Sequence, residues 1–233
     1  MLPASGARTV VLATLASLGL LAGFATGCGT INDTKQVLNR ADLVNDLASR
    51  LDNASELTYL AKYQLANGAT ATITQAQGPR RTAYVYPGGR VVLDNKSTAQ
   101  CRKAPSGTTC TLTDPLLTSS ALPAGLLDAA NADGLVAPTL VMGMLTTAAL
   151  DDNASIEQSD TTIAGQHATC VDVQQAENVS SFKACITTDG VLGSFSGLVS
   201  GRAVELSLVD YTATVPVDAF DLPAGAKIGR AHV

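Results

Sequence analysis

The hydrophobic positions of this chain recur with two different periods, and the change of period predicts where the first helix gives way to strands. Over residues 35–52, apolar residues are spaced three and four apart, which is the period of an amphipathic helix. The stripe consists of Val37, Leu38, Ala41, Val44, Leu47, Ala48 and Leu51. Asp33 or Thr34 can cap this helix at its start, and Asp52-Asn53 can end it.

Short segments rich in Thr and Val, with alternating apolar and polar positions, follow the helix. They are residues 57–65, 69–76, 80–86, 90–94, 97–101 and 108–113. The turns between them contain Asn67-Gly68, Gly78-Pro79, Pro87-Gly88-Gly89 and Pro105-Ser106-Gly107. Short strands separated by such turn residues predict an antiparallel meander.

The middle of the chain interrupts the strands with two predicted helices, residues 123–132 and residues 139–150, the second with Pro138 in its first turn. Further strands are predicted at residues 155–163, 166–175, 182–188, 190–197 and 204–211. This order of elements predicts an α+β fold with one large antiparallel sheet and the helices on one side of it.

The first 27 residues have the layout of an export signal peptide. Arg8 is their only charge, and a largely apolar run of fifteen residues, 10–24, is too short for the roughly 20 residues of a transmembrane helix. Ala25-Thr26-Gly27-Cys28 resembles the bacterial lipobox, whose cysteine becomes the acylated first residue of the mature protein. We therefore expect residues 1–27 to be cleaved and Cys28 to carry lipid, palmitate included, because two buried chains anchor a protein stably.

At the C-terminal end, residues 228–233 look like the translation of a common sequencing adapter rather than native sequence. We expect no role for them in fold or function, and we expect the native C-terminus to differ. Residues 28–35 are then an anchor and tether, and residues 36–227 fit a single domain.

Once Cys28 is assigned to lipid, four cysteines remain, and an even count in an exported protein predicts disulfides. Four cysteines allow three pairings. Strand geometry favours Cys101–Cys110 and Cys170–Cys185, because each pair would join neighbouring antiparallel strands across a loop. Zinc is the rival interpretation, but the chain has no C-x-x-C and, with His232 discounted, a single histidine. We therefore expect no metal site.

The charge of the chain argues against nucleic-acid binding, and the lack of catalytic motifs argues against an enzyme. Without Arg8 and Arg230, the 15 basic residues fall to 13 against 20 acidic ones, a net charge of −7 with no basic stripe. No dinucleotide, Walker or zinc-protease motif occurs, and the sequence around Phe195 lacks the serine of a nucleophile elbow. His167 fits a strand surface, and Asp151-Asp152 fits a turn after a helix. We expect neither an enzyme nor a cofactor.

The remaining feature that bears on function is an apolar helix. The helix at residues 139–150 carries no charge and is hydrophobic nearly all round, so it either lines a ligand cavity or lies in an ordinary core. If a cavity exists, its candidate lining residues are Leu140, Val141, Met142, Met144 and Leu145.

The chain resembles the bacterial lipoprotein-carrier superfamily with the LolA/LolB-like fold, and within it the mycobacterial LppX/LprG group of envelope lipoproteins. The resemblance is carried by the lipobox at Cys28, the helix at 35–52, the helices inserted between strand blocks, and the runs 183–192 and 217–223. It implies a half-open barrel, with an N-terminal helix and two or three inserted helices over its concave face, around a cavity for acyl chains. The Ala-, Thr-rich and Lys-poor composition is typical of an actinobacterium.

These features predict a non-enzymatic lipoprotein on the outer face of the cytoplasmic membrane that binds a lipid or lipidated ligand as a carrier or chaperone. An envelope transport protein is an expected partner. The alternative is a sensory or regulatory lipoprotein of the same fold that binds a membrane partner protein.

Overall fold

The structure is a computed structural model that describes residues 28–116 and 125–231. Its first part comprises helix α1 (Cys28–Asn53), a 3-10 turn (Ala54–Glu56) and strands β1 (Tyr59–Leu65), β2 (Thr70–Gln77), β3 (Arg80–Tyr86), β4 (Gly89–Leu93), β5 (Thr98–Ala104) and β6 (Gly107–Thr113). Helices α2 (Asp128–Ala132) and α3 (Pro138–Ala149) follow. The last part comprises β7 (Ser155–Ile163), β8 (Gln166–Gln174), β9 (Phe182–Thr187), β10 (Leu192–Val199), β11 (Arg202–Thr212) and β12 (Lys227–Arg230).

The twelve strands form one sheet in the order β12-β6-β5-β4-β3-β2-β1-β11-β10-β9-β8-β7. The N-terminal meander and the C-terminal meander meet where β1 pairs with β11. The sheet is open, with β12 and β7 at its edges, so the predicted α+β fold with a half-open barrel is confirmed. The sheet is mixed rather than purely antiparallel, because β12 runs parallel to β6.

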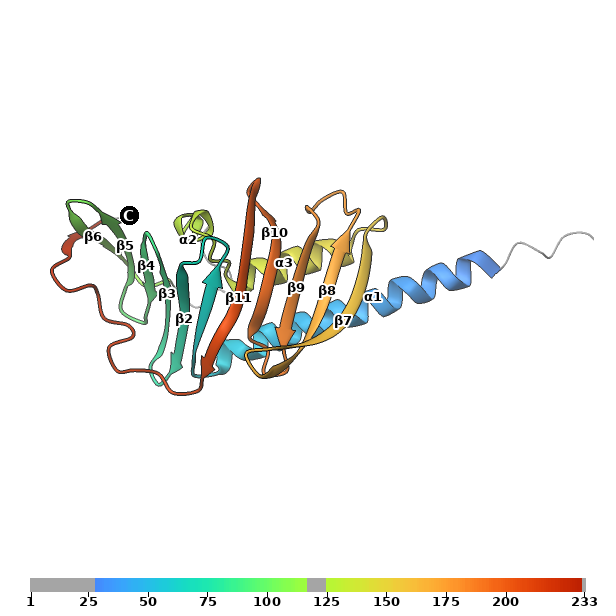
Figure 1. The fold of residues 1–233 in the computed structure, drawn as a ribbon, viewed down its shortest axis with the longest axis horizontal. Coiled ribbons are helices and arrows are strands. Elements are labelled where there is room, and N and C mark those ends of the chain that lie inside the picture. Colours follow the sequence, from blue (N-terminus) through green and yellow to red (C-terminus); the bar gives the residue numbers. More distant parts are fainter. Residues whose placement is uncertain (1–27, 117–124, 232–233) are drawn as a thin grey trace, which may run out of the picture. The chain divides into compact units, whose positions relative to one another are not determined.

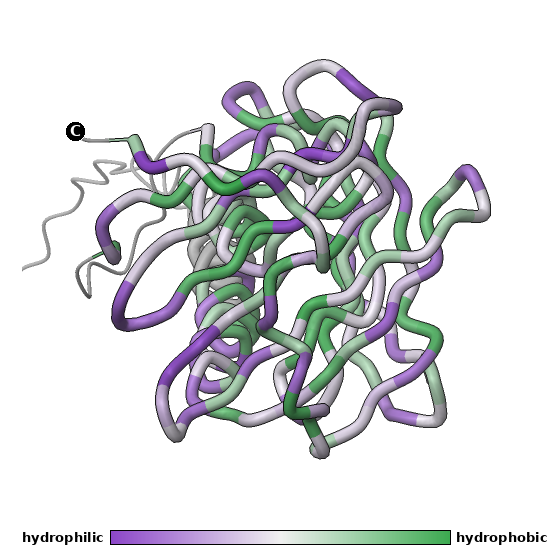
Figure 2. Tube along the Cα trace, turned by 90° about the vertical axis from the view of Figure 1, so that its left-hand side faces the viewer, coloured by the Kyte–Doolittle hydropathy of each residue, from purple (hydrophilic) through white to green (hydrophobic). Residues whose placement is uncertain are grey.

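From Val37 on, α1 lies on the same face of the sheet as α3 (Figure 1). On α1, Val44, Leu47 and Leu51 are buried, as their spacing of three and four predicts. The strands bury every second residue against these helices, as in Tyr59, Ala61, Tyr63 and Leu65 of β1. The resulting core also includes Val141 and Leu145 of α3. Figure 2 shows the same alternation of hydrophobic and hydrophilic positions along the strands.

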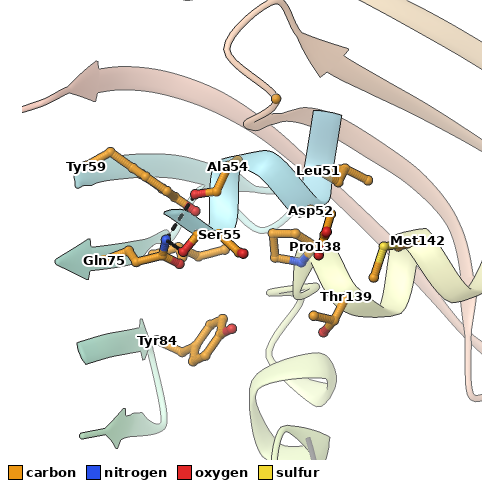
Figure 3. A pocket seen from close by; sticks show the side chains of 12 residues that line it. Leu51, Asp52, Ala54, Ser55, Tyr59, Gln75, Tyr84, Pro138, Thr139 and Met142 are labelled. Atoms are coloured by element: carbon orange, nitrogen blue, oxygen red, sulfur yellow. Dashed lines mark hydrogen bonds between the residues drawn. The ribbon is translucent and has the colours of Figure 1, made fainter. Parts of the chain in front are cut away.

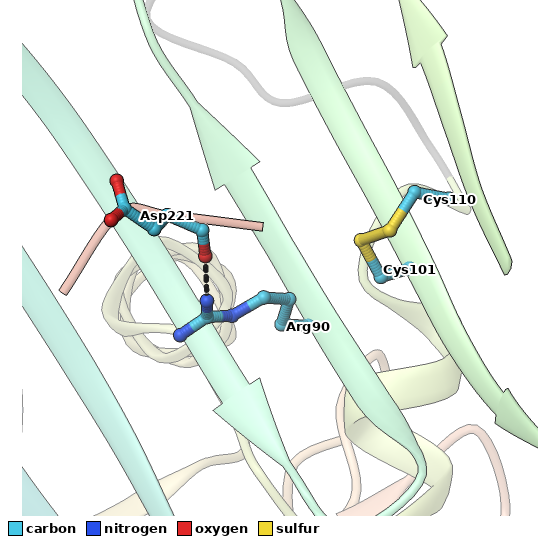
Figure 4. The surroundings of a disulfide bond; sticks show 4 residues. All are labelled: Arg90, Cys101, Cys110 and Asp221. Atoms are coloured by element: carbon cyan, nitrogen blue, oxygen red, sulfur yellow. Dashed lines mark hydrogen bonds between the residues drawn. A yellow bond between two sulfur atoms is a disulfide. The ribbon is translucent and has the colours of Figure 1, made fainter. Parts of the chain in front are cut away.

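The opposite face of the sheet is covered over β2–β5 by the segment that follows β11, which we call the strap (residues 215–222). Phe220 of the strap is buried in a second hydrophobic cluster with Ala83 and Val92. The guanidinium of Arg81 lies 4.2 Å from the centre of the Phe220 ring. Arg90 extends from β4 and donates a hydrogen bond to the main-chain oxygen of Asp221 (Figure 4). The strap therefore encloses apolar surface that the helices do not reach.

Several strand ends differ from the predicted ones by up to three residues, and α2 begins at Asp128 rather than at residue 123. Two differences are larger. Helix α1 begins at Cys28 rather than near residue 35, so the predicted tether is helical and the helix does not begin at Asp33 or Thr34. Residues 28–35 contain no proline that would interrupt a helix. The chain divides into two compact units between Gln36 and Val37, and the second contains the whole sheet.

The second difference is at the C-terminus, where we expected no role in the fold for residues 228–233. Three of these residues, Ile228–Arg230, belong to β12 and pair with β6. All four residues of β12 are exposed. An open strand edge accepts an extended segment through main-chain groups alone, which explains why a segment without buried side chains is ordered there.

Candidate functional site

A small pocket of about 70 Å³ opens where the end of α1, the start of α3 and strands β1–β3 meet (Figure 3). Its apolar wall includes Leu51, Ile73 and Met142. Its polar groups come from Tyr59 and Tyr84, among others. The pocket therefore combines an apolar wall with a few polar atoms, which is the usual composition of a small-molecule site.

One side of the pocket is fixed by Gln75 of β2, which is buried. Its Nε2 donates to the main-chain oxygens of Ala54 at 3.0 Å, Ser55 at 2.5 Å and Leu57 at 3.0 Å. These bonds add to the main-chain bond that the Ala54 oxygen accepts from the N–H of Leu57, and they hold the 3-10 turn against the sheet. The end of α1 is consequently a rigid wall.

Gly190, in the turn between β9 and β10, allows a close approach at the same end of α1. Its φ is +82°, and a Cβ atom at this position would lie 2.0 Å from the main-chain oxygen of Arg50. Any other residue would both strain this turn and push it away from α1.

Two phenol groups face the pocket, from Tyr59 on β1 and Tyr84 on β3 (Figure 3). Burial raises the pKa of Tyr84 to about 12, and burial also raises the pKa of Tyr59. Both groups are therefore neutral hydrogen-bond donors at neutral pH. Within residues 28–116 and 125–231, neither hydroxyl has a hydrogen-bond partner, so each is free to bind a ligand or water.

Helix α3 forms the opposite wall of the pocket, and its contacts with the rest of the protein differ in kind from those of α1. Its N-cap residue Ala137 provides no side-chain hydrogen bond, and Pro138 occupies the first turn. The Thr146 hydroxyl donates to the main-chain oxygen of Met142, and the Thr147 hydroxyl donates to that of Gly143. Among the described residues, no side-chain hydrogen bond links α3 to another element. In this part of the chain, α3 is therefore held on the sheet by burial of apolar side chains such as Val141 and Leu145.

Of the five residues predicted to line a cavity, one lines the pocket and four pack in or against the core. Met142 lines the pocket. Val141, Met144 and Leu145 are buried in the core, and Leu140 is partly buried against it. Ligand pockets for small molecules commonly enclose about 300–1,000 Å³, so the space beside Met142 holds only a small group as it stands.

The structure joins Cys101 to Cys110 and Cys170 to Cys185, the two pairs that the sequence favours. The members of each pair are directly opposite each other on neighbouring antiparallel strands, with Cα atoms 4.0 Å and 3.9 Å apart. Cys28 is the first residue of α1. Among the described residues, no group of three or more His, Cys, Asp or Glu side chains is placed to hold a metal ion. No helix in that part of the chain is long and apolar enough to cross a membrane.

The pocket residues on the strands, Tyr59, Gln75 and Tyr84, are not predicted from the sequence. The position of Gln75 could have indicated this site. Its side-chain amide lies within a strand, and a buried amide needs hydrogen-bond partners. His167 is exposed on β8, as expected for a surface residue. Asp151 accepts main-chain hydrogen bonds from Asn153 and Glu177, which fits the predicted turn.

No protein-family model matches the chain, and no curated protein matches it in sequence. Several solved structures are similar to it, three of which follow. One is an uncharacterized conserved protein from Thermus thermophilus, with 12% identity, a TM-score of 0.47, and coverage of 80% of this chain and 98% of that one. The second is a chain of the MucA/MucB complex from Pseudomonas aeruginosa, with 16% identity, a TM-score of 0.47, and coverage of 78% and 61%.

The third comes from a crystal structure of MucB in complex with MucA(peri), with 16% identity, a TM-score of 0.41, and coverage of 78% and 59%. The match thus spans less than two thirds of the chains from the MucA/MucB structures. These identities and TM-scores are too low to assign a family. Membership in the lipoprotein-carrier superfamily, and in its LppX/LprG group, therefore stays a prediction.

Proposed function

We propose that this protein is a non-enzymatic, extracytoplasmic lipoprotein, anchored to the membrane through Cys28, that binds a lipid or another hydrophobic ligand between α3 and the sheet. The disulfides Cys101–Cys110 and Cys170–Cys185 support the compartment, because disulfides persist in oxidising environments outside the cytoplasm. A binding protein tethered to a membrane can exchange its ligand with that membrane, as a carrier or chaperone does.

The observation that carries this proposal is the way α3 is held. It is an uncharged helix without a side-chain hydrogen bond to the rest of the described chain, and it borders a pocket at its N-terminal end. Moving it breaks no side-chain hydrogen bond between α3 and another described element, and acyl chains that take the place of its side chains keep the apolar surface out of water. In this proposal α1 stays in place when α3 moves, because the hydrogen bond from Gln75 fixes the end of α1.

The pocket beside Met142 is then the point of entry, and the hydroxyls of Tyr59 and Tyr84 are the polar groups that a ligand meets there. Binding requires α3 to move, because a pocket of about 70 Å³ is smaller than a lipid-binding cavity.

Native mass spectrometry after mild detergent extraction tests the proposal, with Met142→Lys as the variant. Met142 is partly exposed, so a lysine can direct its ammonium group to solvent while its stem blocks the entrance. We expect the unchanged protein to carry co-purifying lipid and the variant to carry at least about tenfold less, a loss of about 1.4 kcal/mol in binding.

Thr146→Lys is the matched control, since Thr146 lies one turn along the same helix and is exposed. We expect it to retain the lipid. A protein that carries no lipid in any preparation, or an equal loss in both variants, contradicts the proposal.

A further inference from the structure

The charges of this protein are separated along the sheet. Residues 80–113, which form β3–β6, carry six basic side chains and one acidic side chain. Residues 151–212, which form β7–β11, carry two basic and nine acidic side chains. The strand order places these two groups at opposite ends of the sheet. The protein is acidic overall, yet the end that contains β6 is basic, even with Asp218 and Asp221 of the strap on its outer face.

The two edges of the antiparallel sheet are protected to different degrees. β7 presents Glu157 and Asp160 along an exposed strand, and charges on an edge discourage pairing with other chains. β6 has the sequence Gly-Thr-Thr-Cys-Thr-Leu-Thr, without a charge or a proline. The edge of β6 is therefore chemically suited to accept another strand.

The main-chain groups that β6 offers can be identified from its pairing with β5. Cys110 lies opposite Cys101 with the Cα atoms 4.0 Å apart, which is the narrow spacing of a pair that exchanges no main-chain hydrogen bonds. The N–H and C=O of Cys110 therefore point away from β5, as do those of Thr108 and Leu112. Consistently, the N–H of Ala231 donates to the main-chain oxygen of Leu112 at 3.0 Å.

The strand that occupies this edge is weakly held. β12 has four residues, Lys227–Arg230, and all of them are exposed. It contributes main-chain hydrogen bonds and no buried side chain, so its displacement costs little beyond those bonds, which water or another strand can replace.

We propose that the edge of β6 is a docking site for an extended acidic segment of a partner protein, which adds to the sheet as a parallel strand in place of β12. Main-chain hydrogen bonds to β6 provide the affinity, as in other cases of strand addition. Arg102 and Lys103, both exposed on the neighbouring strand β5, provide the preference for acidic residues. The pocket beside α3 shares no residue with this site.

Fluorescence anisotropy with a labelled ten-residue peptide of alternating Glu and Thr tests the site. We expect the full chain to bind this peptide, and a chain truncated after Ala226 to bind it more tightly, because β12 no longer competes. The double variant Arg102→Glu/Lys103→Glu should bind about tenfold more weakly, and Lys183→Glu, an exposed site on β9, should bind as the unchanged chain does. A Lys/Thr peptide and a Glu/Thr peptide with a central proline are expected to bind poorly.

Amide hydrogen exchange in the full chain distinguishes strand addition from a general attraction of charges. Bound peptide should slow exchange at the N–H groups of Cys110 and Leu112 beyond the protection that β12 gives. Binding without this protection overturns the proposal, and so does equal binding of the acidic peptide by the charge-reversed variant. Self-association of the truncated chain without peptide binding assigns the edge to a second copy and likewise overturns it.

Discussion

At the scale of single residues, Asp151 connects two segments that lie 26 residues apart in the chain. Its carboxylate accepts hydrogen bonds from the main-chain N–H groups of Glu177 at 2.6 Å, Asn153 at 3.0 Å and Asn178 at 3.4 Å. These bonds, that of Glu177 first, lower the pKa of Asp151. Asp151 thereby holds the loop between β8 and β9 against the residues that follow α3.

The lowered pKa predicts how stability depends on pH. A carboxyl group whose pKa is lower in the folded state stabilises the fold above its unfolded pKa of about 3.9, and this contribution is lost as pH falls through the folded pKa. Asp151→Asn should therefore lower the melting temperature at pH 7, and the difference from the unchanged protein should shrink below about pH 4. Asp152→Asn, at an exposed neighbour, is the control. Thermal unfolding between pH 2 and pH 7 measures both, and a difference that does not vary with pH contradicts the assigned bonds.

Tyr63 gives a second prediction at this scale. Its side chain is fully buried, and its hydroxyl has no hydrogen-bond partner in the described part of the chain. An unsatisfied buried polar group costs about 1–3 kcal/mol, so Tyr63→Phe should leave the free energy of unfolding unchanged or raise it. Tyr63→Ala should lower it by about 3–5 kcal/mol, because it leaves a cavity. Urea unfolding of both variants checks the pair, and a destabilised Tyr63→Phe variant would reveal a bound water or ligand at the hydroxyl.

At the scale of elements, the disulfides act on two different hairpin-like units, β5–β6 and β8–β9. The cysteines are 9 residues apart in the first unit and 15 in the second. In the chain-entropy model, closing loops of this length stabilises a fold by about 3 kcal/mol each, slightly more for the longer loop. The disulfides therefore contribute locally, and neither links the two halves of the sheet.

Replacing each cysteine pair by alanine tests this division. Cys101→Ala/Cys110→Ala and Cys170→Ala/Cys185→Ala should each lower the free energy of unfolding by about 3 kcal/mol, measured in urea. Because the two units share no residue, the effects should add in the fourfold variant. Adding reductant should destabilise the unchanged protein and leave the fourfold variant unaffected. A variant that loses no stability contradicts the corresponding disulfide.

Most strand boundaries could be predicted from the sequence because turn residues separate the strands. Residues 80–86 and 155–163 are predicted without error, since Gly78-Pro79, Pro87 and Gly165 fix their ends. β12 could not be predicted, because its pairing depends on an edge formed by β6 and on no side chain of its own. The pocket was missed for a similar reason, as its polar residues come from strands that the topology brings beside the ends of two distant helices.

At the scale of the whole molecule, the two faces of the sheet are covered by different parts of the chain. The helices bury one face, and the strap covers the other only over β2–β5, where Phe220 is buried. The outer face of β1 and β11 carries exposed polar residues such as Lys62, Gln64 and Glu205. The proposed ligand site therefore uses the helix side of the sheet, and the proposed partner site lies at its basic end.

The proposed attachment to the membrane joins these features into one function, and Cys28 tests it. We expect the unchanged protein to fractionate with membranes and to incorporate a palmitate analogue, and Cys28→Ser to be lost from both. Alkylation of the denatured protein provides an independent count: a lipidated chain should show no free thiol before reduction and four after it. Cys101→Ala/Cys110→Ala should remain in the membrane and show two. A free thiol in the unchanged, membrane-bound protein would mean either that Cys28 carries no lipid or that one of the two disulfides is open. The Cys28→Ser variant distinguishes the two cases. It loses the free thiol only if that thiol belongs to Cys28.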